Sequence, residues 1–122
     1  MTGKTVQSVG IKNIFKKVPG PAEEEFFEQL AGSAPVRVER IVSHGHCSPQ
    51  SGWYDQGHSE FVIVLAGAAR LEFEGGRNAE LRKGDWLEIA PHCRHRVAWT
   101  QPDTDTVWLA VHYPAIEEGE TE

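Results

Sequence analysis

The sequence has few cysteines and no long apolar segment. Two cysteines, Cys47 and Cys93, are too few for a disulfide framework, so we expect free thiols in a reducing compartment. The longest wholly apolar run covers only residues 61–66, whereas a membrane-spanning helix needs about 20 apolar residues. The first ten residues contain no hydrophobic signal region. We therefore expect a cytoplasmic protein that does not enter a membrane.

Positive charge is also scarce. The 122 residues include 12 Lys and Arg against 18 Asp and Glu, which gives a formal net charge of −6. Nucleic acids and anionic membranes bind basic surfaces, so this balance argues against both as the main partner. The sequence instead contains 39% hydrophobic residues, with four Trp and five Phe, enough for one compact globular domain.

The N-terminal region predicts a short helix. Pro21 suits a first helical turn, the following glutamates suit the positive end of the helix dipole, and Gly32 suits a helix end. We expect this helix over about residues 21–31, after a strand near residues 13–18. The remainder of the chain shows no convincing helical pattern.

Short segments of β-branched, aromatic or alternating residues follow, separated by Gly, Pro and Asp. They predict eight strands, and eight short strands indicate an all-β sandwich or barrel. The predicted division is an N-terminal strand and helix covering the barrel (1–35), the barrel (36–113) and an acidic flexible tail (114–122). The expected strands are 36–43, 52–56, 60–66, 68–74, 79–82, 86–89, 94–100 and 106–113.

The segment 61–66 is apolar on both faces, so its sheet must be covered on both sides. Either the N-terminal helix or a second subunit can provide that cover. Together with the apolar segment 106–113, this pattern predicts a homodimer.

Two polar clusters fall at the ends of predicted strands. The first spans residues 53–60 and the second spans residues 92–99. If the sheet closes on itself, Glu60 and His95 converge inside a partly apolar cavity. One carboxylate and one imidazole in such a place form a metal-binding or acid/base constellation.

The spacing within these clusters resembles the paired motifs of the cupin superfamily. Six residues separate Glu60 from Gly67, as in the second half of the first cupin motif, and Gly84 precedes His95 by the eleven positions of the second. The sequence looks like a small single-domain type-2 cupin with a degenerate first motif. The resemblance implies a double-stranded β-helix, or jelly roll, and a divalent metal (Fe, Mn, Ni or Zn) as cofactor, with no organic cofactor.

The first motif departs from the family at two positions, because Tyr54 and Gln56 replace its histidines. The ligand set that the resemblance implies here is Gln56, His58, Glu60 and His95. Glu60 and Tyr54 are then the candidate catalytic residues. The other candidate pocket residues, besides Gln56, are Trp53, Trp99 and His112.

Each assignment has a structural alternative. Glu60 and His95 can instead form a buried ion pair without metal, and His58 can lie on a solvated loop after Gly57. The tryptophans are also typical barrel filling or dimer contacts. A structural zinc site across two loops is a further alternative, with candidate ligands in residues 44–47 and 92–95.

The pattern favours a small-molecule pocket inside the barrel. With a metal, the expected chemistry is that of an isomerase or a dioxygenase, in which Glu60 or Tyr54 moves a proton. The competing hypothesis is a non-catalytic binding, sensing or interaction module that has lost its metal site.

Overall fold

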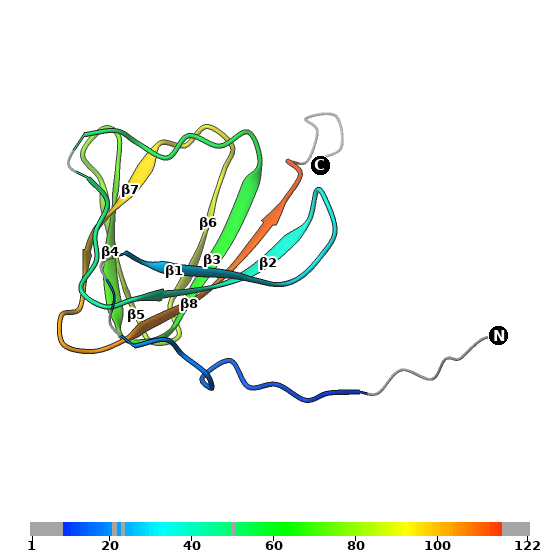
Figure 1. Ribbon diagram of the computed structural model, residues 1–122. Helices are drawn as coiled ribbons and strands as arrows, with labels where there is room; N and C mark the ends of the chain where they lie inside the picture. The colour runs from blue at the N-terminus through cyan, green and yellow to red at the C-terminus, as the bar shows by residue number, and fades with distance from the viewer. Residues whose placement is uncertain (1–8, 21, 23, 50, 116–122) are drawn as a thin grey trace.

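Two antiparallel sheets face each other and enclose one interior (Figure 1). The computed structural model describes residues 9–20, 22, 24–49 and 51–115. The larger sheet has the order β1-β2-β8-β3-β6 and the smaller sheet has the order β5-β4-β7. The strands are β1 (Phe26–Ala31), β2 (Arg37–Ser43), β3 (Ser59–Ala66), β4 (Ala68–Phe73), β5 (Asn78–Arg82), β6 (Trp86–Ile89), β7 (His95–Thr100) and β8 (Thr106–Tyr113). This all-β arrangement is the predicted jelly roll.

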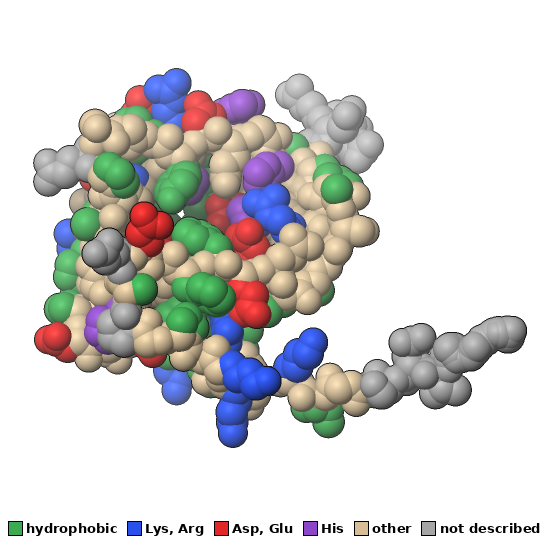
Figure 2. Space-filling view, in the orientation of Figure 1, with side chains coloured by type: hydrophobic (Ala, Val, Ile, Leu, Met, Phe, Trp, Pro, Cys, Tyr) green, Lys and Arg blue, Asp and Glu red, His purple; other side chains and the backbone are tan. Residues whose placement is uncertain are grey.

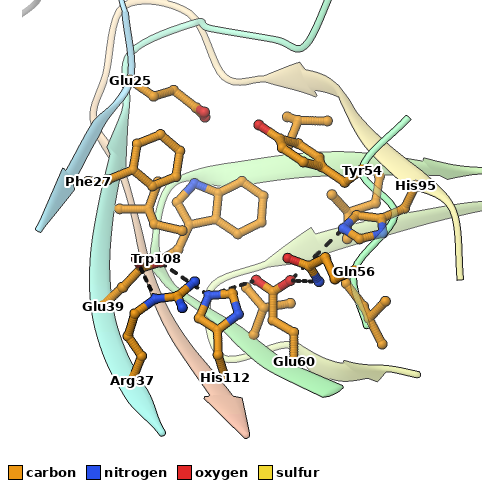
Figure 3. Close-up of a pocket in the computed structure, with 15 residues that line it drawn as sticks. Glu25, Phe27, Arg37, Glu39, Tyr54, Gln56, Glu60, His95, Trp108 and His112 are labelled. Carbon is orange, nitrogen blue, oxygen red and sulfur yellow. Dashed lines mark hydrogen bonds and ion pairs between the residues drawn. The ribbon is translucent and has the colours of Figure 1, made fainter. Parts of the chain in front are cut away.

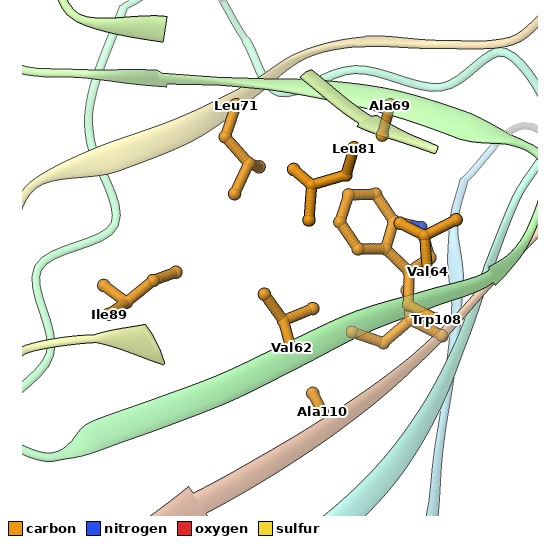
Figure 4. Packing of buried hydrophobic residues seen from close by; sticks show 9 residues of the cluster. Val62, Val64, Ala69, Leu71, Leu81, Ile89, Trp108 and Ala110 are labelled. Carbon is orange, nitrogen blue, oxygen red and sulfur yellow. The ribbon is translucent and has the colours of Figure 1, made fainter. Parts of the chain in front are cut away.

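Alternation along the strands builds the core between the sheets. On β3, Val62 and Val64 point inward, and on β4 Ala69 and Leu71 meet them from the smaller sheet (Figure 4). Burying such side chains stabilises each by roughly 1.5–3 kcal/mol relative to exposure. The core cluster comprises Ile41, Val62, Val64, Ala69, Leu71, Leu81, Ile89, Trp108 and Ala110.

The predicted N-terminal helix is wrong where the structure describes it. Residues Phe26–Ala31 form β1, which pairs antiparallel with β2 from Phe26↔Val42 to Ala31↔Val38. Pro21 and Glu23, at the predicted helix start, lie outside the described residues. Sheet pairing outweighs helix propensity here, because propensity differences of less than about 1 kcal/mol per residue yield to tertiary contacts.

The strand predicted near residues 13–18 is also absent. That segment turns instead, with the Lys16 amide donating to the Asn13 carbonyl at 3.0 Å. The buried Arg40 guanidinium donates to the carbonyls of Ile14 and Lys16 at 3.1 and 2.8 Å and so holds the turn against β2. The predicted strand 52–56 shrinks to a single bridge between Tyr54 and His95. Most of the predicted acidic tail lies outside the described residues.

None of the described residues forms a helix that could cross a membrane.

A tight connection between β3 and β4 requires glycine at position 67. Gly67 has φ of +82°, and a Cβ there would lie 2.4 Å from Thr106 Oγ1 and 2.7 Å from Thr106 Cα. Gly76, in the β4–β5 turn, also has a positive φ, +98°, but a Cβ there would meet open space. A side chain would strain the backbone at both positions, but it would clash with Thr106 only at position 67.

We expect Gly67→Ala to lower the free energy of unfolding by about 3 kcal/mol, because strain and clash add. Gly76→Ala is the matched control and should cost only about 1 kcal/mol from backbone strain. Urea unfolding of both variants measures the difference. Equal losses would show that the close approach of Thr106 does not constrain position 67.

Candidate functional site

A cavity of about 230 Å³ opens between the sheets and borders the core (Figures 2 and 3). Figure 2 shows hydrophobic, acidic and histidine side chains around a hollow on this face. All five strands of the larger sheet contribute to its walls, together with β4 and β7 of the smaller sheet. The lining residues are Glu25, Phe27, Arg37, Glu39, Ile41, Tyr54, Gln56, Glu60, Val62, Leu71, Ile89, His95, Val97, Trp108 and His112.

Glu60 and His95 meet in this cavity from opposite sheets. Glu60 lies on β3, opposite His112 of β8, and is 9% exposed. His95 begins β7 and is 5% exposed. His95 Nε2 lies 4.0 Å from Glu60 Oε1, too far for a hydrogen bond. The predicted proximity therefore exists, but the two groups do not bond to each other.

A backbone carbonyl fixes the orientation of the His95 ring. Nδ1 lies 2.8 Å from the carbonyl oxygen of Cys93, and that oxygen can only accept, so Nδ1 carries a proton and donates. In the neutral ring, Nε2 then presents its lone pair to the cavity. The imidazole is consequently a ready acceptor or base aimed at the space beside Glu60.

Glu60 is held from the side by Gln56, whose amide nitrogen donates to Oε1 at 3.1 Å. The backbone next to Gln56 is anchored in turn, because the His92 amide donates to the Gln56 carbonyl at 2.6 Å. His112 Nε2 lies 3.9 Å from Glu60 Oε2. The carboxylate is thus positioned on the wall of the cavity.

Both ring nitrogens of His112 have partners other than Glu60. Its Nε2 lies 3.2 Å from Glu39 Oε1 and its Nδ1 lies 2.9 Å from His58 Nε2. Arg37 Nε in turn donates to Glu39 Oε2 at 3.1 Å. His58 therefore stands behind His112 and does not line the cavity. Burial, followed by the charges of His112 and Arg37, lowers the pKa of His58.

Tyr54 lies at the mouth of the cavity and is 47% exposed. Its backbone pairs with that of His95 through hydrogen bonds of 2.8 and 3.2 Å, and the two rings lie 5.6 Å apart. Burial raises the pKa of the Tyr54 phenol, and the charges of Glu25 and Glu60 raise it further. The hydroxyl is therefore a neutral donor near neutral pH.

Two tryptophans predicted for the pocket lie elsewhere. The Trp53 ring stacks under the Arg96 guanidinium at 4.7 Å and is absent from the cavity lining. Trp99 pairs with Arg70 because the register of β4 and β7 shifts between Arg70 and Leu71. That bulge turns Trp99 to the outer surface of the smaller sheet, where simple alternation from His95 would place it inside.

The cavity residues that the sequence did not predict include Glu25, Phe27, Arg37 and Glu39. Strand alternation could have indicated Arg37 and Glu39, because they lie on the same face as the core residue Ile41. Glu25 and Phe27 were hidden by the predicted helix.

The donors in the cavity do not fit the metal that the cupin pattern implies. Among the described residues, no three His, Cys, Asp or Glu side chains lie close enough together to hold an ion. Gln56 turns its amide nitrogen to Glu60, Tyr54 remains a neutral phenol, and His112 has both ring nitrogens engaged. Glu60 and His95 alone supply two of the four ligands expected.

The alternative zinc site between two loops is not assembled either. His44 Nδ1 lies 3.0 Å from Asp105, and His46 Nε2 lies 2.7 Å from the Ala22 carbonyl. His46 Nδ1 accepts from the His44 amide at 2.9 Å. Both histidines therefore serve to fasten the loop after β2, with Cys47 exposed beside them.

Comparison with known proteins agrees with this fold. The family model described as "Cupin domain" matches residues 38–112. The chain belongs to the cupin family. A solved structure from Ralstonia eutropha JMP134, named as a putative mannose-6-phosphate isomerase, is 45% identical to this cupin with a TM-score of 0.83, covering 87% of this chain and 99% of that one.

More distant structures share the fold alone. A cupin superfamily protein from Desulfitobacterium hafniense DCB-2 is 15% identical, with a TM-score of 0.66 over 80% of this chain and 84% of that one. The structure of FeII HppE is 17% identical, with a TM-score of 0.62 over 73% of this chain and 50% of that one. No curated protein matches the sequence.

Proposed function

We propose that this cupin binds a small polar molecule in the barrel cavity, between Glu60 and His95, without a resident metal ion. The observation that carries the proposal is the 4.0 Å gap between two nearly buried polar groups. A structural ion pair would close that gap, because a hydrogen bond to a charged group contributes about 1.5–3 kcal/mol. A ligand that fills the cavity can pair with both groups.

The chemistry available to a bound ligand is proton transfer. Glu60 can accept a proton, the open Nε2 of His95 can accept or return one, and the neutral Tyr54 hydroxyl can donate one at the mouth. Such a set suits an isomerase-type reaction on a small substrate. A module that only binds or senses the ligand would use the same groups for recognition.

The name of the Ralstonia protein suggests a sugar phosphate as ligand. The charges in this cavity argue against that class for the present chain. Its single guanidinium, Arg37, is already paired with Glu39, while Glu25 and Glu60 also line the cavity. A phosphate would meet two carboxylates of like charge.

The rival hypothesis is a metal-dependent isomerase or dioxygenase with Fe, Mn, Ni or Zn at Glu60 and His95. The open Nε2 of His95 is the observation that favours it, since metal-binding histidines commonly donate their other ring nitrogen to a carbonyl. The incomplete donor set weighs more heavily, because structural and catalytic metal sites in proteins use three or four protein ligands.

Elemental analysis of protein purified without a histidine tag tests the proposal. We expect far less than one metal ion per chain, and thermal stabilisation by at least one of a panel of neutral polyols, amines and carboxylic acids. Glu60→Gln and His95→Gln should abolish that stabilisation, whereas His92→Gln, which changes an exposed histidine outside the cavity, should retain it. A stoichiometric metal lost in His95→Gln and kept in His92→Gln would contradict the proposal.

We further propose a homodimer formed through the outer face of the larger sheet. Phe61 of β3 and Trp86 of β6 stack there with ring centroids 5.2 Å apart, and Trp86 is 61% exposed. Ile63 pairs with both Trp86 and Leu109, so the apolar strip continues across three strands. A partner subunit would remove this strip from water.

Light scattering should give the mass of two chains for the native protein. Trp86→Glu should give the mass of one chain, because it places a charge in the centre of the strip. Trp99→Glu, on the smaller sheet, is the matched control and should keep the dimer mass. A monomeric native protein, or a dimeric Trp86→Glu variant, would refute this interface.

A further inference from the structure

Negative charge dominates the cavity of the proposed function. Glu25, Glu39 and Glu60 line it together with one guanidinium, Arg37. Arg37 lies 3.1 Å from Glu39, so these two charges largely compensate each other. Among the described residues, Glu25 has no cationic side chain within ion-pair distance. Glu60 accepts from the neutral amide of Gln56, and its ion-pair partners are only the histidine nitrogens at 3.9 and 4.0 Å. Two carboxylates are therefore left to face the cavity.

The position of Glu25 is fixed by a short chain of hydrogen bonds. The Ser43 hydroxyl donates to Glu25 Oε2 and itself accepts from Trp108 Nε1 at 3.1 Å. Ser43 is fully buried, so this arrangement is part of the barrel wall. Figure 3 shows the Glu25 carboxylate and the Tyr54 hydroxyl pointing toward one another across the mouth.

Aromatic rings form the walls between the two carboxylates. Phe27 of β1, Tyr54 and Trp108 of β8 all line the cavity (Figure 3). The faces of such rings carry negative electrostatic potential and attract cations within about 6 Å of the ring centre. Aromatic rings and carboxylates that line the same cavity are typical of sites that bind amines and quaternary ammonium groups. The volume of about 230 Å³ limits the occupant to a small molecule.

We propose that the ligand of this cavity is a small organic cation, an amine or quaternary ammonium compound, held between Phe27, Tyr54 and Trp108 with its charge toward Glu25 and Glu60. The inference rests on the proposed function and names the ligand class of that same site. Polar groups of the cation reach the open nitrogen of His95 and the amide of Gln56. Charge complementarity favours this class over anions, and ring faces favour it over sugars.

Calorimetric titration with three probes tests the ligand class. Choline carries the charge, 3,3-dimethylbutan-1-ol has the same shape without it, and glycerol 3-phosphate is an anion. Choline should bind about tenfold more tightly than the neutral alcohol, a difference typical of a desolvated cation on aromatic rings. Glycerol 3-phosphate should not compete with it.

Two substitutions test whether choline binds in this cavity. Glu25→Gln should weaken choline binding about tenfold and leave the neutral alcohol unchanged. Glu80→Gln is the matched control, because Glu80 lies outside this cavity and is 60% exposed at its side chain. Choline binding that equals that of the alcohol, or that is unchanged in Glu25→Gln, overturns the inference.

Titration of Tyr54 gives a second readout. The chain has two tyrosines, so Tyr113→Phe leaves Tyr54 as the only phenol. Bound choline should lower the pKa of Tyr54, because a cation at the mouth stabilises the phenolate, whereas the neutral alcohol should not. An unchanged phenol titration with choline bound would place the cation elsewhere and contradict the proposal.

Different results would contradict the proposed ligand class and the proposed function. If neutral polyols bind and Glu60→Gln abolishes that binding, while choline has no advantage, the cavity is a ligand site of a different class. If a stoichiometric metal occupies Glu60 and His95, both proposals fall together.

Discussion

The site depends on one hydrogen bond, from His95 Nδ1 to the carbonyl of Cys93. Because that carbonyl can only accept, the bond sets both the tautomer and the direction of the ring. Nε2 is thereby turned inward, toward Glu60, while the strands keep it 4.0 Å away. The jelly roll uses its two sheets to hold an acid and a base apart across a hollow. A polar interior of this kind costs stability in the free protein and is compensated when a ligand fills it.

The remaining side chains of the cavity follow from this separation. Gln56 occupies the side of Glu60 where the cupin pattern has an imidazole, and His112 is engaged by Glu39 and His58. Two of the four metal ligands that the family pattern implies are thus replaced, by Tyr54 and Gln56, and Gln56 hydrogen bonds to the retained Glu60. What remains open to a ligand is a carboxylate, an imidazole nitrogen, a phenol and aromatic ring faces. This surface recognises shape and charge in an organic molecule better than it coordinates an ion.

The sequence predicts the strands from β2 to β8 closely, because alternation and turn residues are local signals. It fails at β1, where Glu and Leu favour a helix locally but pairing with β2 decides the outcome. Glu60 and His95 follow from motif spacing, whereas Trp99 is misplaced by a bulge that only the register reveals. Glu25 and Phe27 enter the cavity through β1, so one wrong element removed two residues from the predicted site.

The protonation of the His95 ring tests the account most directly. Nitrogen-15 NMR of the labelled native protein, with His95→Gln to assign the signals, reports which ring nitrogen carries the proton. We expect the proton of the neutral ring to lie on Nδ1 and Nε2 to be bare. A proton on Nε2, shared with Glu60, would mean that the two residues form a closed structural pair and that the cavity has no open acid and base.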